Sequence, residues 1–138
     1  MTRVVPLLVV VLLLAACGGG GGTTDAEQIK QAWTTFFSAK TSVSDRVAEL
    51  QDGARFKATI ANLASNPLAR QLSAKVSSVT LEGANKAKVV YSIYFGNIAA
   101  FPNQVGYAYK QNGKWLVGFA GLCKLIAQQE TPPAACTS

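Results

Sequence analysis

The sequence predicts an α+β fold in which N-terminal helices pack on a curved antiparallel sheet of about four strands. Between residues 26 and 64, apolar side chains recur every three or four positions, as they do along one face of a helix. Between residues 74 and 119, apolar and polar side chains alternate, as they do in strands that bury one face. Because the helical pattern comes first and the strand pattern follows it, we expect an antiparallel sheet with the helices on its apolar face.

The first helix is expected to begin after Thr24 and to end near Ala39. The stretch Thr24–Glu27 matches a capping box, in which the threonine oxygen accepts a hydrogen bond from the backbone N–H of the glutamate. Large apolar residues follow at helical spacing, so this helix is expected to pack on the sheet. These residues are Ile29, Trp33, Phe36 and Phe37.

Two shorter helices are expected next. Residues 43–50 place Val43, Val47 and Leu50 on one face, and Gly53 is a plausible helix-ending glycine. Residues 56–63 repeat the same apolar spacing with Phe56, Ile60 and Leu63. This third helix should end before Asn66-Pro67, because the residue before a proline avoids the helical region.

The strands are expected at residues 74–83, 86–95 and 104–119. The last of these ranges reads as a hairpin, because Asn112-Gly113 suits a tight turn between two alternating runs. A short closing helix or turn is expected around residues 122–126.

Aromatic residues at alternating strand positions are the candidate ligand-binding side chains. With aromatic residues of the helices they could line a pocket, since small-molecule sites are mostly apolar with a few polar groups. They could equally fill the core. Both interpretations stay open at this point. The residues are Trp33, Phe37, Tyr91, Tyr107, Tyr109 and Trp115, with Phe56 beside them.

Residues 96–103 are expected to form a loop that carries Ile98 and Phe101 before Pro102. If these apolar side chains are exposed, they mark a contact with a partner or a membrane. If they fold over the core, they form a lid.

The N-terminus has the three parts of an export signal. Arg3 supplies a positive charge, residues 4–14 are almost wholly apolar, and Ala15-Ala16 are small. The alternative is a short spanning or core helix, but a membrane span needs roughly 20 apolar residues. Residues 1–16 are therefore expected to be a signal peptide.

The sequence Leu14-Ala15-Ala16-Cys17 resembles the lipobox of bacterial lipoproteins. The resemblance implies cleavage before Cys17 and acylation of this cysteine, which would hold the protein on the membrane. The alternative is an ordinary signal with a chance cysteine. Residues 17–24, with Gly18–Gly22, would form a flexible tether. Residues 25–138 would form a single extracytoplasmic domain.

The remaining cysteines are Cys123 and Cys136. A pair in an exported domain suggests a disulfide that ties down the C-terminal tail, and two free thiols are the alternative. No metal site is expected, because the chain has no histidine and two cysteines cannot close a tetrahedral site.

The chain has 13 basic and 7 acidic residues and a formal net charge of +6. The basic residues are scattered, whereas nucleic-acid-binding domains usually cluster them, so no nucleic-acid partner is expected. Weak attraction to anionic lipid or wall polymers stays open.

The order of elements resembles the cone-shaped fold of the nuclear transport factor 2-like superfamily. The stretches FFSAKTSVSDRVAELQDGARF, NPLARQLSAKVSSVTL and QNGKWLVG resemble actinobacterial exported proteins related to the mycobacterial low-molecular-weight protein antigen family. The resemblance covers roughly residues 25–127 and its motifs define the fold. It implies no active-site residue in this chain.

Enzymes of the wider superfamily use a carboxylate, often with tyrosine or histidine, inside the cone. Here no Asp or Glu lies between Glu82 and Glu130, and histidine is absent. We therefore expect no catalytic residues and no cofactor. The expected function is that of a non-catalytic, membrane-anchored lipoprotein of the cell envelope that binds a protein partner, a wall component or a small apolar ligand. The alternative is an isomerase- or dehydratase-like enzyme with an atypical site.

Overall fold

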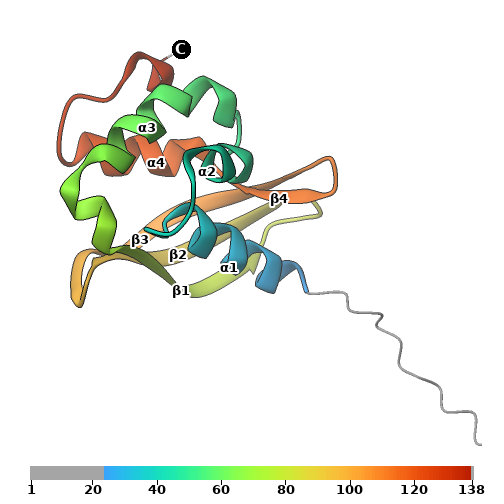
Figure 1. Cartoon of the computed structure of the whole chain (residues 1–138). Coiled ribbons are helices and arrows are strands. Elements are labelled where there is room, and N and C mark those ends of the chain that lie inside the picture. The colour runs from blue at the N-terminus through green and yellow to red at the C-terminus, as the bar shows by residue number, and fades with distance from the viewer. Residues whose placement is uncertain (1–23, 138) are drawn as a thin grey trace, which may run out of the picture.

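The computed structural model describes residues 24–137 as helices followed by a four-stranded sheet and a closing helix (Figure 1). The predicted α+β fold is therefore confirmed.

No helix within these residues is long and apolar enough to cross a bilayer. The elements are α1 (Asp25–Phe36), α2 (Val43–Glu49), η1 (Gly53–Phe56), α3 (Lys57–Ser65), η2 (Pro67–Gln71), β1 (Leu72–Leu81), β2 (Lys86–Phe95), β3 (Ile98–Gln111), β4 (Lys114–Val117), α4 (Phe119–Ala127) and η3 (Ala134–Cys136).

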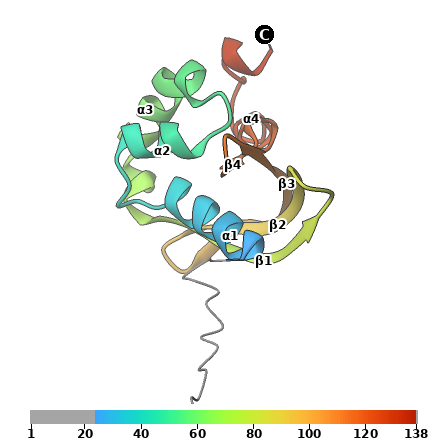
Figure 2. The same ribbon diagram turned by 90° about the vertical axis from the view of Figure 1, so that its right-hand side faces the viewer.

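The strands form an antiparallel meander in the order β1-β2-β3-β4. The sheet curls around one side of the core, while the helices close the other side (Figure 2). Register shifts interrupt both long pairings, between Val76 and Ser78 on β1 and between Tyr91 and Tyr94 on β2. Such bulges bend a strand and increase its twist, which lets a sheet of few strands curl.

The core lies between α1 and the concave face of the sheet. Trp33 of α1 and Tyr91 of β2 are among its most deeply buried side chains. All of the buried hydrophobic side chains described belong to residues 29–126. This segment thus carries its own core, and we expect residues 24–138 to fold in isolation.

Two helix boundaries lie where their local signals place them. The backbone N–H of Glu27 donates to Thr24 Oγ1 at 3.2 Å, which confirms the predicted N-cap of α1. Asn66 takes an extended ψ of 131° and ends α3 before Pro67, as the proline requires. The first helix ends at Phe36, three residues earlier than expected, because Phe37 leaves the helical region with ψ 18°.

The prediction that Gly53 ends the second helix is wrong. That helix ends at Glu49, and Leu50 turns into an extended conformation to pair with Val117. The left-handed residue is Asp52, with φ 53°. Gly53 is needed for space instead, because a Cβ there would overlap the carbonyl group of Val47.

The prediction of a loop over residues 96–103 is also wrong. Gly96 and Asn97 make the turn, and β3 begins at Ile98. The strand tolerates Pro102 because it lies at a register shift, where Ser92 Oγ accepts a hydrogen bond from Asn103 N at 3.0 Å.

The apolar residues of this segment are divided between the surface and the core. Ile98 is 71% exposed, whereas Phe101 packs partly buried against the core. The segment therefore has one apolar side chain exposed and one packed against the core, and a contact of Ile98 with a partner or a membrane stays a prediction.

The hairpin predicted at Asn112-Gly113 is confirmed. Both residues have positive φ, 52° and 77°, as a type I′ turn requires. The turn joins β3 to the short strand β4 with Gln111 opposite Lys114.

Candidate functional site

A pocket of about 120 Å³ lies where the end of α1 meets α3, η2, α4 and the strands of the β2–β3 hairpin. Its walls are mainly apolar side chains from all of these elements. Exposed residues, including Leu68, Asn66 and Glu130, also line it, so the pocket opens to solvent. The apolar lining residues are Phe36, Phe37, Ile60, Leu63, Leu68, Ala69, Leu72, Ile93, Phe95, Phe101, Leu122, Leu125 and Ile126.

Arg46 is the buried charge of this pocket. Its side chain lines the wall although the residue is only 5% exposed. Its Nη2 donates to the carbonyl oxygen of Ser38 at 2.6 Å, and its Nε finds no hydrogen-bond partner among residues 24–137. Within the same residues it forms no ion pair. Loss of water contact lowers the pKa of the Arg46 guanidinium.

Local structure explains why the arginine lies there. Ser42 caps α2 by accepting from Asp45 N at 3.2 Å, and Arg46 follows one turn later. Arg46 follows Val43 by three positions and precedes Leu50 by four, so it lies on the apolar face of α2. Its guanidinium thereby reaches Ser38, just beyond the C-terminal end of α1, where the helix dipole favours a cation.

The titratable lining residues are Arg46 inside and Glu130 on the exposed rim. The sequence reasoning missed both. A charge at helical spacing within the apolar stripe of residues 43–50 was the available signal for Arg46. Glu130 had no such signal, because its position depends on how the chain turns after α4.

The predicted aromatic site residues do not line one pocket, although three of them are in contact with one another. Phe37 lines the pocket, but Trp33 and Tyr91 lie behind it in the core. The Tyr91 ring stacks on Phe37 and meets Trp33 at a tilt, each at a centroid distance of 5.7 Å. These side chains mainly fill the core.

Trp115 lies at the other end of α1 from the pocket. It is 2% exposed, and its Nε1 donates to Asp25 Oδ1 at 2.9 Å, at the start of that helix. This tryptophan joins the last strand to the first helix and is no part of the pocket.

Tyr107 and Tyr109, for which a pocket and a core position were both open, lie on the outer face of β3 and line neither the pocket nor the core. The buried residues of this stretch are Gly106 and Ala108. The register shift after Phe101 changes which residues of β3 face inward, because side chains alternate strictly along a strand. Gly106 also meets the large core residues: a Cβ there would lie 3.1 Å from the Tyr91 ring.

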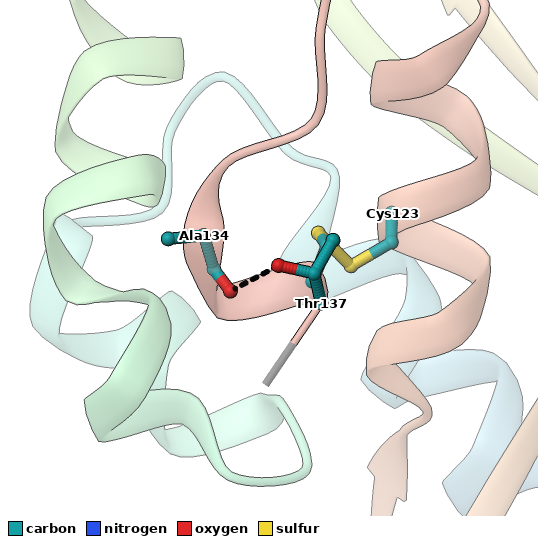
Figure 3. The surroundings of a disulfide bond; sticks show 4 residues. Cys123, Ala134 and Thr137 are labelled. Carbon is teal, nitrogen blue, oxygen red and sulfur yellow. Dashed lines mark hydrogen bonds between the residues drawn. A yellow bond between two sulfur atoms is a disulfide. The ribbon is translucent and has the colours of Figure 1, made fainter.

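Cys123 of α4 and Cys136 of η3 form a disulfide, with an S–S distance of 2.07 Å (Figure 3). It holds the tail against the helix that supplies one wall of the pocket. Beside it, Thr137 Oγ1 donates to the carbonyl oxygen of Ala134 at 3.0 Å (Figure 3). Cys17, the predicted signal peptide of residues 1–16 and nearly all of the predicted tether lie outside the described residues.

Metal binding has no support within residues 24–137, where no three His, Cys, Asp or Glu side chains come close enough to hold an ion.

The model of one protein family, described as the C-terminal domain of the low molecular weight antigen MTB12, matches residues 22–133. The matched stretch includes α1 to α4, the whole sheet and every residue that lines the pocket. It agrees with the antigen-family resemblance seen in the sequence. No curated protein matches the chain.

Proposed function

Because the chain belongs to the family of the low molecular weight antigen MTB12 C-terminal domain, we propose that it is a lipid-anchored protein of the cell envelope that binds a small apolar ligand without changing it chemically. The observation that carries the proposal is the open pocket at the end of α1, with its apolar walls. A wall component or a protein partner that inserts an apolar group would use the same site.

The size of the pocket suits a small apolar group. Its volume of about 120 Å³ compares with roughly 150 Å³ for an apolar cavity that takes up benzene. Leu68, 52% exposed, leaves apolar surface at the mouth. A ligand larger than the pocket can therefore continue out of it in contact with apolar side chains.

The charged residues of the pocket favour binding over catalysis. Proton transfer needs groups that gain and lose a proton near neutral pH, and arginine stays protonated there. Of the titratable lining residues, this leaves Glu130, which is exposed on the rim. Glu130 is the one observation that favours the alternative, an isomerase- or dehydratase-like reaction. In that case Glu130→Gln would abolish turnover and spare binding.

The anchor is argued from the first residues of the chain. The export pattern of residues 1–16 and the lipobox-like Leu14–Cys17 support acylation of Cys17 on the extracytoplasmic face of the membrane. The Cys123–Cys136 disulfide supports export, since disulfides persist in oxidising compartments.

Ligand binding can be tested with residues 24–138, incubated with a total extract of the producing cells and then measured by native mass spectrometry. We expect extra mass that disappears on denaturation. Ala69→Phe should abolish it by filling the pocket, whereas Ala61→Phe on the exposed face of α3 should retain it. A bare wild-type domain, or extra mass that survives Ala69→Phe, would contradict the proposal.

The anchor needs a test on the full chain in cells. With an alkyne analogue of a fatty acid as metabolic label, wild-type protein and Cys136→Ser should be labelled and found with the membranes. Cys17→Ala should lose the label and leave the membrane fraction. A labelled Cys17→Ala protein would overturn the anchoring argument.

A further inference from the structure

We propose that the pocket binds a long-chain carboxylic acid, with its carboxylate on Arg46 and its alkyl chain leaving across the apolar rim. This inference rests on the proposed function and names the class of ligand. It follows from the hydrogen bonds of Arg46, the charges that face the pocket, and the size and rim of the pocket.

Arg46 has a donor that the described residues do not use. Its Nη2 is occupied by Ser38 O at 2.6 Å, but its Nε–H is buried without a partner. A buried unpaired donor is unfavourable, and so is a buried charge without a counter-charge. A carboxylate at this wall would supply both an acceptor and the missing negative charge. Charge-assisted bonds of this kind are the strongest that side chains form.

The charges around the pocket favour a single negative charge held inside. Arg46 is the cation of the lining, and Glu130 on the rim is exposed to water. A carboxylate at the mouth would meet the like charge of Glu130, whereas one on Arg46 would meet the opposite charge. A phosphate monoester brings roughly two negative charges near neutral pH, for which one arginine is a poor match.

Because the pocket is small, most of the alkyl chain of such a ligand must lie outside it. A volume of about 120 Å³ holds the carboxylate and the first few carbons. Phe95 and Phe101 line the pocket and are partly exposed, and Ile98, opposite Phe95 in the β2–β3 hairpin, is 71% exposed. Together with Leu68 they provide an apolar surface for the rest of an alkyl chain.

The test compares decanoate with decanol, which has the same chain and a neutral head, by calorimetry on residues 24–138. Both probes are used below their aggregation limits. We expect decanoate to bind roughly tenfold or more tightly than decanol, as one charge-assisted hydrogen bond implies. Arg46→Met should remove this preference. Arg70→Met removes an exposed charge that does not line the pocket, and should keep the preference.

Since Arg46→Met also removes the bond to Ser38, a second measurement uses the unmodified domain. The Arg46 Nε–H signal in ¹⁵N spectra should shift with decanoate and stay in place with decanol. Equal binding of the two probes would overturn the role of Arg46 and leave the proposed function standing. Binding of neither probe, together with a bare domain after exposure to extract, would refute both.

Discussion

Among single residues, Tyr91 shows how closely the core is fitted. Its ring lies against Phe37 and Trp33, and Gly106 makes room for it. A Cβ on Gly106 would come within 3.1 Å of the ring. Strand β3 can approach Tyr91 this closely because Gly106 carries no side chain.

The raised pKa of Tyr91 also makes the stability of the domain depend on pH at alkaline values. Burial raises the pKa of Tyr91 to about 12, with the nearby Trp33 indole acting in the opposite direction. An unfolded tyrosine ionises near pH ~10. Between these values the unfolded state loses its proton first, so this contribution to stability is complete below pH ~10 and is lost as the pH rises to about 12.

The unfolding free energy of wild type should fall as the pH rises from ~10 to about 12. In Tyr91→Phe this fall should be smaller by about 1–3 kcal/mol, because the variant has no phenol to ionise at this position. Urea unfolding at a series of pH values measures the difference. Tyr94→Phe, three positions further along the same strand, is the matched control and should follow the wild-type profile. Parallel curves for wild type and Tyr91→Phe would contradict the argument.

Among the elements, β3 and α4 decide the shape of the site. The register shift near Pro102 turns Gly106 and Ala108 inward and lets Phe101 reach the pocket wall. Helix α4 contributes Leu122, Leu125 and Ile126 to the opposite wall. The disulfide from Cys123 to Cys136 holds the following tail against this helix.

The disulfide should contribute measurably to stability. It closes a loop with a sequence separation of 13 residues, for which chain-entropy models give about 3 kcal/mol. The double variant Cys123→Ser, Cys136→Ser should lose about this much unfolding free energy in urea. Reductant should lower the stability of wild type to a similar level and leave the double variant unchanged. If reductant does not change the unfolding free energy of the wild-type domain, the disulfide does not stabilise the fold.

At the scale of the whole molecule, α1 separates two ends with different roles. At its start, Asp25 accepts from Trp115 across 90 positions of sequence and lies 3.8 Å from Lys110 Nζ. At its end, Phe36 and Phe37 line the pocket. A helix of 12 residues is about 18 Å long. A domain tethered through Thr24 would therefore be attached at the end of α1 away from the pocket.

The contact at the start of α1 closes the fold, and its loss should be costly. Trp115→Ala is expected to lower the unfolding free energy by about 3–5 kcal/mol, because it removes a buried indole and leaves a cavity. Leu81→Ala, at a position 49% exposed, should change it by less than about 0.5 kcal/mol. Chemical denaturation of both variants makes the comparison. A small effect of Trp115→Ala would show that β4 and α1 are not held by this residue.

The sequence alone determined the features whose causes are local. The cap at Thr24, the helix end before Pro67 and the turn at Asn112-Gly113 each depend on a few neighbouring residues, and each lies where it was predicted. The order of periodic segments was sufficient for the α+β class. The antigen-family resemblance needed no structure either.

Tertiary structure alone decided the site. Which face of β3 points inward depends on a register shift against Ser92, and this placed Tyr107 and Tyr109 outside. Gly53 is required by its approach to Val47, which local sequence does not reveal. Arg46 of α2 and Glu130, which follows α4, line one pocket because these elements converge there with α1, α3 and the strands of the β2–β3 hairpin. Periodicity indicates which residues are buried, whereas contacts between distant segments decide what they are buried against.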